Sequence, residues 1–417
     1  MDEFRLITLD PGHFHAALVQ KEMYAGVSKR VAVYAPLGTD LTEHLTRIVR
    51  FNLRMQNPTA WELEVHAAPD FLERMIAERP GNIVVLSGRN RAKIRYIRTA
   101  LDAGLHVLAD KPWVIRSADL PALEAALATS ARTGLVAYDI MTERYEITTI
   151  LQRELVNDPE VFGSIGPGTQ QEPAVYMESV HHILKLVAGV PNRRPAWFFD
   201  IHEQGEALSD VGTHLVDLVQ WTLFPSSGID YRQDIRMLQA SRWATTITAV
   251  QFRRVTGEPG ESLDYYCNTS VSYALRGIHT KLDVLWRWEA PAGGGDTHFA
   301  VYRGSKSRIE VRQGVAENHR PELYVIPGDS GVAHALTRRV GELSKEYPGI
   351  ALEKHEAEFR VTIPHQYRVG HEAHFAQVAK RFFHYLRHPE TFPAWENPKM
   401  LSKYHVSTTG VEMSGQT

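Results

Sequence analysis

Short apolar runs alternate with amphipathic segments through the first third of the chain. The apolar runs have the length of strands and lie at 6–9, 31–34, 83–86, 106–109 and 135–138. The helical patterns between them lie at 16–24, 41–53, 92–103 and 120–131. This alternation predicts a parallel, doubly wound sheet of the Rossmann type with right-handed crossovers. We therefore expect a first domain over residues 1–140.

The pattern changes after residue 140. Helical patterns occupy 149–156 and 207–223, and a loop-like stretch lies between them at 163–173. From 235 to 325, long runs alternate between apolar and polar side chains, which is typical of a mostly antiparallel sheet with one packed face. A helical pattern returns at 372–387, before a polar end that we expect to fray. The sequence thus predicts an α/β protein whose second domain, residues 141–417, contains a large, mostly antiparallel open sheet.

Composition limits the classes of function. A chain of 417 residues exceeds the roughly 250 to 300 residues at which a single core stops growing, so two domains are expected. The hydrophobic fraction of 43% and the charged fraction of 23% are typical of a globular protein. A net charge of −3 provides no field that would attract nucleic acid or anionic lipid. The expected partner is a small molecule.

The cysteine content and the apolar segments indicate a cellular location. Cys267 is the only cysteine, so no intramolecular disulfide can form, and its thiol is expected to be inert. No apolar run approaches the roughly 20 residues of a membrane span, and the N-terminal residues lack the basic region of a signal peptide. We therefore expect a cytoplasmic protein without a membrane or nucleic-acid partner.

The turn after the first apolar run reads Asp10-Pro11-Gly12-His13-Phe14-His15. A dinucleotide-binding turn needs small residues, so that backbone N–H groups can approach the pyrophosphate. Only Gly12 remains of a G-x-G-x-x-G pattern, because Asp10 and His15 stand at the first and third glycine positions. An ordinary strand–helix turn is the alternative. Asp40 is a candidate for the acid that binds the adenosine ribose, and the sequence leaves the choice between NAD and NADP open.

Polar side chains follow two further strands. Ser87 and Asn90 follow the third apolar run, and Asp110, Lys111 and Pro112 follow the fourth. Because the carboxyl ends of parallel strands meet at the ligand edge of such a sheet, we expect these residues to line a crevice. The bond before Pro112 could be cis. A plain turn and a surface Lys–Asp pair are the alternatives.

Residues 205–223 carry the most informative helical pattern. With 3.6 residues per turn, Asp210, His214, Asp217 and Trp221 form one stripe. An imidazole with a carboxylate one turn away on each side is held in one tautomer and made more basic, as a general base requires. A buried histidine with structural aspartates is the alternative.

The chain has 20 histidines, which raises the question of a metal site. His371 and His374 lie three residues apart and do not form the His-Glu-x-x-His pattern of a zinc helix. No third ligand is placed near them by the sequence. We therefore expect no metal.

The degenerate turn at 10–15, the Asp110-Lys111-Pro112 strand end and the Asp-x-Gly-x-His-x-x-Asp helix have a distinctive order and spacing. Together they resemble the Gfo/Idh/MocA oxidoreductases, which include glucose–fructose oxidoreductase and inositol dehydrogenase. The resemblance spans about the first 225 residues, and the later sheet fits the second domain of that family more loosely.

The resemblance implies a nicotinamide cofactor, NAD or NADP with NAD preferred, that could stay tightly bound. Gly12 matches the central glycine of the cofactor turn, and Asn90 matches an asparagine beside the nicotinamide. The residues implied to bind the cofactor are Asp10, Gly12, His13, Phe14, His15, Asp40, Ser87, Asn90, Asp110, Lys111 and Pro112. The departures bear on cofactor preference: two cofactor glycines are replaced, Lys93 replaces a usual histidine, and only Gly205 remains of a glycine run before the helix.

The resemblance also implies catalytic roles. Lys111 matches the lysine of the family's Glu-Lys-Pro motif, with Asp110 in place of its glutamate. Asp210 and His214 match the aspartate and histidine that flank the substrate, and Asp217 matches the second acid of that helix. In an oxidation, His214 would accept the hydroxyl proton, Lys111 would stabilise the alkoxide, and Asp210 and Asp217 would orient and tune both.

The implied substrate is a sugar or glycoside that is oxidised at a secondary hydroxyl, which we interpret as the one at carbon three. The expected substrate-binding residues are Trp113, His181, His182, Lys185, Arg194, Trp197, Asp210, His214, Asp217 and His298. The open sheet is expected to form a homo-oligomer. A glycosidase that uses NAD for transient oxidation and elimination is the first alternative. A non-catalytic sensor of a sugar or dinucleotide is the second.

Overall fold

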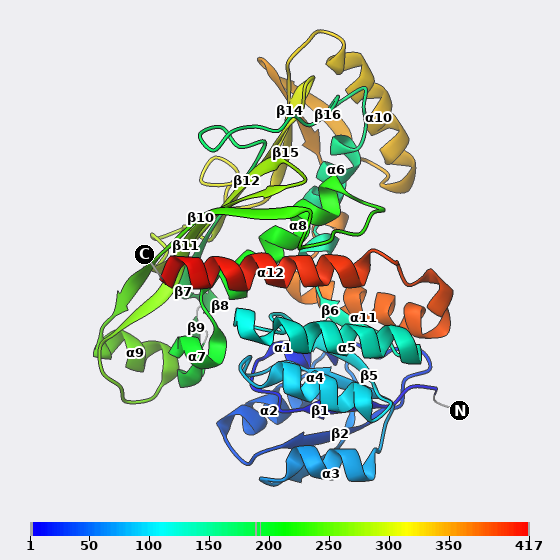
Figure 1. Cartoon of the computed structure of the whole chain (residues 1–417), viewed down its shortest axis with the longest axis vertical. Helices are drawn as coiled ribbons and strands as arrows, with labels where there is room; N and C mark the ends of the chain where they lie inside the picture. The colour runs from blue at the N-terminus through cyan, green and yellow to red at the C-terminus, as the bar shows by residue number, and fades with distance from the viewer. Residues whose placement is uncertain (1–2, 188–189, 192, 416–417) are drawn as a thin grey trace. The chain divides into compact units, whose positions relative to one another are not determined.

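The computed structural model describes residues 3–187, 190–191 and 193–415. The chain forms two compact units (Figure 1). The first contains residues 1–142, 202–205 and 370–404, and the second contains 143–201, 206–369 and 405–417. We expected the first domain to consist of residues 1–140 alone. In the structure, residues 370–404 also belong to the first unit.

The first unit contains a six-stranded sheet in the order β3-β2-β1-β4-β5-β6, and every neighbouring pair is parallel. Its strands are β1 (Leu6–Leu9), β2 (Arg30–Ala35), β3 (Glu62–Ala67), β4 (Ile83–Leu86), β5 (His106–Asp110) and β6 (Ala137–Ile140). Its helices are α1 (His15–Val19), α2 (Thr39–Leu53), α3 (Phe71–Glu78), α4 (Lys93–Asp102), α5 (Leu120–Thr133), α11 (His371–Arg387) and the first half of α12 (Glu396–Gly415). The predicted doubly wound parallel sheet is confirmed.

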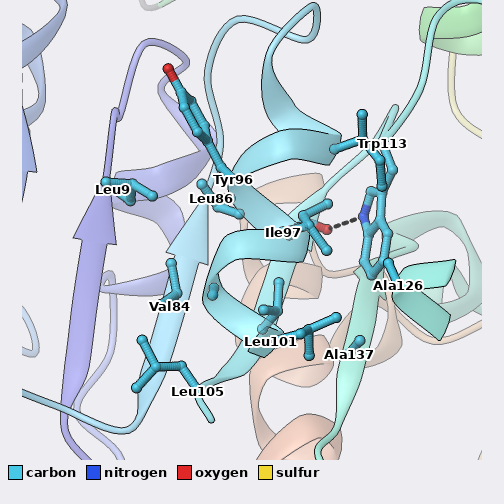
Figure 2. Packing of buried hydrophobic residues seen from close by; sticks show 14 of the residues in the cluster. Leu9, Val84, Leu86, Tyr96, Ile97, Leu101, Leu105, Trp113, Ala126 and Ala137 are labelled. Atoms are coloured by element: carbon cyan, nitrogen blue, oxygen red, sulfur yellow. Dashed lines mark hydrogen bonds between the residues drawn. The ribbon is translucent and has the colours of Figure 1, made fainter. Parts of the chain in front are cut away.

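The core of the first unit lies between the sheet and its helices. The central strands β1 and β4 are buried on both faces, and that is why they read as continuous apolar runs. Figure 2 shows how Ile97 and Leu101 of α4 pack beside Trp113 and Ala126. This packing fixes the strand ends on which the candidate site is built.

The second unit contains a nine-stranded sheet in the order β10-β11-β12-β7-β13-β14-β15-β17-β16. Its strands are β7 (Val175–Leu184), β10 (Ile235–Ile247), β11 (Leu263–Leu275), β12 (Ile278–Glu289), β13 (Thr297–Arg303), β14 (Ser307–Gln313), β15 (Glu322–Pro327), β16 (Ala351–His355) and β17 (Glu358–Thr362). Every neighbouring pair is antiparallel except β7 and β12, so the predicted, mostly antiparallel sheet is confirmed.

Helices accompany this second sheet. They are α6 (Ile147–Val156), α7 (Ile201–Gln204, which groups with the first unit from His202), α8 (Thr213–Leu223), α9 (Ala249–Thr256) and α10 (Val332–Glu346). A small two-stranded sheet joins β8 (Leu186–Val187) and β9 (Val190–Pro191). Helix α6 packs against α8 and β14. The alternation along β12 is clear, because Leu282 and Val284 are fully buried while Lys281 and Asp283, which precede them in turn, are partly exposed.

The structure corrects several predicted elements. Helix α1 ends at Val19 and does not continue to residue 24. The helix predicted over 207–223 begins with a π-helical turn, Leu208–Gly212, before α8. The polar end of the chain does not fray before residue 415, since α12 spans 20 residues. The sequence of α12 lacks the amphipathic pattern by which a helix is usually predicted. Many of its polar side chains are buried and hydrogen-bonded, so the helix has no separate polar face.

None of the helices in the described part of the chain combines the length and the apolar character needed to cross a bilayer.

Candidate active site

The first unit presents three strand ends side by side. Strands β1, β4 and β5 are adjacent and parallel, so their carboxyl ends lie at one edge of the sheet. From β1 the successive strands are added on one side of the sheet, and from β4 they are added on the other side. Ligands of doubly wound sheets bind at this switch point between β1 and β4. The ends of these strands and the segments that follow them contain all the predicted residues of the cofactor site except Asp40, which lies in the first turn of α2.

The turn after β1 packs closely on the turn after β4. The backbone N–H of His13 donates to the carbonyl oxygen of Ser87 at 3.0 Å. A Cβ atom added to Gly88 would lie 2.3 Å from the carbonyl oxygen of Asp10, so only glycine fits at this contact. Asp10 itself has a φ of 47°, a left-handed conformation that a glycine would adopt more easily. Gly88 was not among the predicted site residues, although the sequence Ser87-Gly88 was a visible signal of a tight turn.

Asp110 joins the three turns. Its Oδ2 atom lies 2.8 Å from Nδ1 of His15 and accepts a hydrogen bond of 2.9 Å from Oγ of Ser87. Nδ1 of His13 lies 3.7 Å from the same oxygen. Burial opposes the charge of Asp110, but the neighbouring His15 and Lys93 hold the pKa of its carboxyl well below the usual range. Burial lowers the pKa of His15, against the pull of Asp110.

Lys93 and Asn90 add a second polar layer. Nζ of Lys93 donates to Oδ1 of Asn90 at 2.6 Å and to the backbone oxygen of Asp110 at 2.9 Å. The amide of Asn90 in turn donates to the backbone oxygen of Gln204 at 2.7 Å. Lys93 and Asn90 are almost fully buried. Asn90 thus has the inner position expected of a residue that supports a ligand-binding turn.

The Lys111–Pro112 peptide bond is cis, which confirms that prediction. Lys111 is 8% exposed at the end of β5. The next residue corrects an expectation: Trp113 is fully buried, and its indole Nε1 donates to the backbone oxygen of Ala109 at 3.1 Å (Figure 2). Trp113 is therefore a core residue and not a sugar contact, because its ring packs against α4 and α5.

Asp40, the candidate for the acid that binds the adenosine ribose, forms an ion pair with Arg89. Asp40 lies in the first turn of α2, and its Oδ2 atom is 3.7 Å from a guanidinium nitrogen of Arg89. Asp40 can accept hydrogen bonds from ribose hydroxyls, and Arg89 can interact with a phosphate group. The pair therefore offers a recognition group for either nicotinamide dinucleotide.

In the second unit, Asp210 lies in the π-helical turn and His214 in the first turn of α8. Both side chains are partly exposed. Asp217 differs from the expected stripe, because it is almost fully buried and its two carboxylate oxygens accept hydrogen bonds of 2.6 Å from Nε and a terminal nitrogen of Arg144. This bidentate ion pair joins α8 to the turn before α6. Asp217 therefore supports the helix from its buried side.

Asp296, a residue outside the predicted set, brings three predicted residues together. Its carboxylate lies 3.3 Å from Nδ1 of His181 and 3.0 Å from Nδ1 of His182, and it forms an ion pair with Lys185. Although burial opposes ionisation, His181 and Lys185 hold the pKa of Asp296 well below its usual range. The motif Asp296-Thr297-His298 after a glycine turn was the sequence signal for this residue.

Aromatic rings border the Asp296 cluster. The imidazole of His181 stacks on Trp286 with ring centroids 4.9 Å apart, and its Nε2 atom lies 2.8 Å from Oγ of Ser179. The guanidinium of Arg194 lies over the rings of Phe198 and Trp286. Asp210 contributes to the electrostatic environment of both His181 and Arg194, so these residues share one region of the second unit.

Two other predicted residues lie near this region in different ways. His298 is partly exposed on β13, where it pairs in register with Gln313 of β14 and with Ser179 of β7. Burial lowers its pKa to about 4, so its imidazole is neutral at physiological pH. Trp197 lies in a short 3₁₀ turn, Ala196–Phe199, and is 9% exposed.

The residues of the first unit fit a nicotinamide dinucleotide. Gly12 leaves the centre of the turn without a side chain, and the replacement of the third glycine is accommodated because the His15 side chain is buried beside Asp110. His13, His15 and Asp110 offer three ligand atoms within 4.8 Å of one another. Hydrogen bonds from His15 and Ser87 already supply the carboxylate of Asp110 with partners.

Comparisons with known proteins agree with this geometry. Residues 151–415 match the family model described as "Putative oxidoreductase C terminal domain". A crystal structure described as a "putative oxidoreductase from Parabacteroides merdae ATCC 43184" has 47% sequence identity and a TM-score of 0.97, and the alignment covers 100% of this chain and 98% of that chain. The comparison with curated proteins gives no match.

More distant structures share the fold. GenD2 from gentamicin A biosynthesis, solved with NAD, has 14% identity and a TM-score of 0.61, with coverage of 100% of this chain and 95% of that chain. KijD10, a 3-ketoreductase from Actinomadura kijaniata solved with NADP and TDP-benzene, has 16% identity and a TM-score of 0.57, with 97% of each chain covered. The family model and the similar Parabacteroides protein lead to one assignment: the chain belongs to the family with the "Putative oxidoreductase C terminal domain" and is an oxidoreductase.

Proposed function

We propose that the chain oxidises a secondary hydroxyl of a sugar or glycoside, at carbon three of the ring, with a nicotinamide dinucleotide as hydride acceptor. The observation that carries this proposal is the convergence of His181, His182 and Lys185 on Asp296 beside the ring of Trp286. A sugar needs fixed donors and acceptors next to an apolar ring face, and this region provides both. KijD10, which shares the fold, is described as a 3-ketoreductase.

The catalytic roles follow from the chemistry of three side chains. His214 accepts the proton of the reacting hydroxyl, and Lys111 stabilises the negative charge that grows on its oxygen. Asp210, one turn before His214, orients the imidazole. The nicotinamide ring supplies the hydride acceptor when it is bound. Asp217 acts through the position of α8, because its carboxylate is engaged by Arg144.

We propose NAD as the preferred cofactor, held by the turn at 10–15, by the turn at 87–90 and by the end of β5. Asp40 favours NAD because its carboxylate would repel a 2′-phosphate, although Arg89 lies close to it. The absorption spectrum and mass spectrum of the purified protein test whether the cofactor stays bound. Calorimetric titration of cofactor-free protein with NAD and NADP tests the preference. Equal or tighter binding of NADP would overturn it.

One experiment separates the dehydrogenase from the NAD-dependent glycosidase. The protein is incubated with a panel of 4-nitrophenyl glycosides and with NAD or NADP. A dehydrogenase produces a keto-sugar and NADH in equal amounts, whereas a glycosidase releases nitrophenol without net NADH. Turnover of simple alcohols, with none of any sugar, would refute the carbohydrate assignment. A sensor would bind a ligand without either product.

We also propose that the protein is a cytoplasmic homo-oligomer that assembles through the open face of the nine-stranded sheet. Trp243 on β10 is 41% exposed, which is unusual for an aromatic side chain in a strand. The neighbouring surface on β10, β11 and β12 is polar and is lined by Gln239, Ser241, Ser270, Ser272 and Lys281. Light scattering after gel filtration tests the assembly, and Trp243→Glu should shift it toward the monomer.

A further inference from the structure

Three of the positions at which this sequence departs from the pattern of the Gfo/Idh/MocA oxidoreductases that it resembles meet in the structure. His15 stands at the third glycine of the cofactor turn, Lys93 stands at a usual histidine, and Asp110 stands at the glutamate of the Glu-Lys-Pro motif. His15 and Lys93 are 95 and 17 residues away from Asp110 in the sequence, yet both contact it. The three departures therefore form one cluster.

The contacts restrain Asp110 at both of its polar ends. His15 and Ser87 hold the carboxylate at 2.8 and 2.9 Å, while Lys93 holds the backbone oxygen at 2.9 Å. All four residues are at most 8% exposed. A buried carboxylate is stable only when its oxygens are hydrogen-bonded, so this arrangement is specific and leaves Asp110 little freedom to turn.

The sizes of the side chains are complementary. Aspartate is one methylene shorter than glutamate, so its carboxylate lies nearer to the end of its own strand. Histidine in place of glycine supplies a side chain that spans the resulting distance from the turn after β1. The imidazole of His15 also packs on Phe375, with ring centroids 4.6 Å apart, and this contact fixes its direction.

We propose that His15 and Lys93 are positioning residues that set the place of Lys111 relative to the cofactor turn. The inference rests on the proposed function, because it assigns to Lys111 a role at the reacting oxygen. Lys111 follows Asp110 directly, so the restraint on the carboxylate and carbonyl of Asp110 fixes the backbone from which the Lys111 side chain extends. A shift of about 1 Å in a catalytic group can cost about a hundredfold in rate.

The test compares substitutions of His15 that keep or remove the hydrogen bond. His15→Asn retains a donor close to the position of Nδ1, whereas His15→Leu fills similar space without a donor. The matched control is His106→Asn, because His106 lies at the other end of β5 and also makes one hydrogen bond, from the backbone N–H of Val136. We expect kcat to fall about tenfold or more in His15→Leu, and about threefold or less in His15→Asn and in the control.

A double substitution tests the size argument. His15→Gly and Asp110→Glu each disrupt the cluster, but the two together restore the family's pattern of a small turn and a longer acid. We expect the double variant to have a kcat closer to wild type than either single variant. Additive losses in the double variant would overturn the inference, as would wild-type kcat in His15→Leu.

A readout without substrate keeps the inference separate from the proposed function. The rate of reductive methylation of Lys111, measured by mass spectrometry in cofactor-free protein, reports the environment of its amine. We expect this rate to change several-fold in His15→Leu and in Lys93→Met, and to stay at the wild-type value in His106→Asn. Unchanged labelling of Lys111 in both variants would refute the positioning role. Failure of wild type to bind either cofactor would refute the proposed function, while the labelling result would still decide this inference.

Discussion

The Nζ atom of Lys403 lies 2.9 Å from Oδ2 of Asp139, and neither side chain is exposed to solvent. The hydroxyl of Tyr404 donates to the same oxygen at 2.6 Å. Asp139 lies on β6, in register with Ala109 of β5, and Tyr404 also makes a hydrogen bond with the backbone of Trp113. Helix α12 therefore supports the segment that follows Lys111 from the buried side of the first unit.

We predict that Lys403→Met destabilises the protein by about 3 to 5 kcal/mol, because it leaves a buried carboxylate without its cation. Urea unfolding, followed by circular dichroism, measures this loss. The double variant Lys403→Met with Asp139→Leu removes both charges and should recover most of the stability. A loss below about 1 kcal/mol in the single variant would mean that Tyr404 alone satisfies Asp139.

Gly88 is expected to be essential for the contact between the turns after β1 and β4. An alanine Cβ at this position would lie 2.3 Å from the backbone oxygen of Asp10, so the two turns must separate. We predict that Gly88→Ala weakens cofactor binding at least about tenfold, since backbone shifts at a phosphate-binding turn remove its close approach. Calorimetric titration with NAD measures the effect. The control is Gly370→Ala, a glycine of the same unit that has open space around its Cβ position and a φ of −72°, which alanine adopts without strain.

The apolar pattern was sufficient to predict the central strands of the first unit. It did not predict strand β3 or helix α12, and in both cases the reason is physical. Strands β1 and β4 are buried on both faces, so their sequence is unambiguous. Strand β3 was missed because it lies at the edge of the sheet and most of its side chains are exposed, so it has no apolar run. Helix α12 was missed because its buried positions include Lys403 and Ser407.

The candidate site, too, could be predicted from the sequence only where the signal is local. The strand-end residues were found because each follows an apolar run directly. The partner of Asp217 was not found, since Arg144 lies 73 residues earlier and nothing local connects the two. Likewise, Trp113 looks like a ligand contact next to Lys111, and only the packing of α4 and α5 around it identifies it as core.

The carboxyl group of Glu146 should make the stability of the folded protein depend on pH. Burial, followed by the nearby charge of Glu143, raises the pKa of its carboxyl from 4.5 to about 7. Because the folded state binds this proton more tightly than the unfolded state, the contribution of Glu146 is fully present below pH 4.5 and is lost as the pH rises through about 7. We predict that Glu146→Gln raises the melting temperature relative to wild type at pH 8 and leaves it unchanged at pH 4. Thermal melts across this range measure the difference, and equal curves at pH 8 would contradict it.

We predict that activity needs no metal ion. Among the described residues, the one group of three His, Cys, Asp or Glu side chains close enough to hold an ion is His13, His15 and Asp110. Its carboxylate already has hydrogen-bond partners in His15 and Ser87. Treatment with EDTA should therefore leave kcat unchanged, and elemental analysis should find no stoichiometric metal. Loss of activity on chelation, restored by zinc but not by magnesium, would contradict the prediction.

Lys111→Ala and His214→Ala should each reduce kcat at least about a hundredfold, because both groups act on charge that develops in the transition state. The fold should remain, since neither side chain belongs to the apolar core, and the melting temperature provides that check. The two variants should differ in their pH profiles. Without His214 the residual rate should rise with pH, because hydroxide replaces the missing base, whereas without Lys111 the dependence on His214 should persist. Steady-state production of NADH from the best sugar of the panel, measured from pH 5 to 10, distinguishes the two roles. A rate within a few-fold of wild type in either variant would remove that residue from the mechanism.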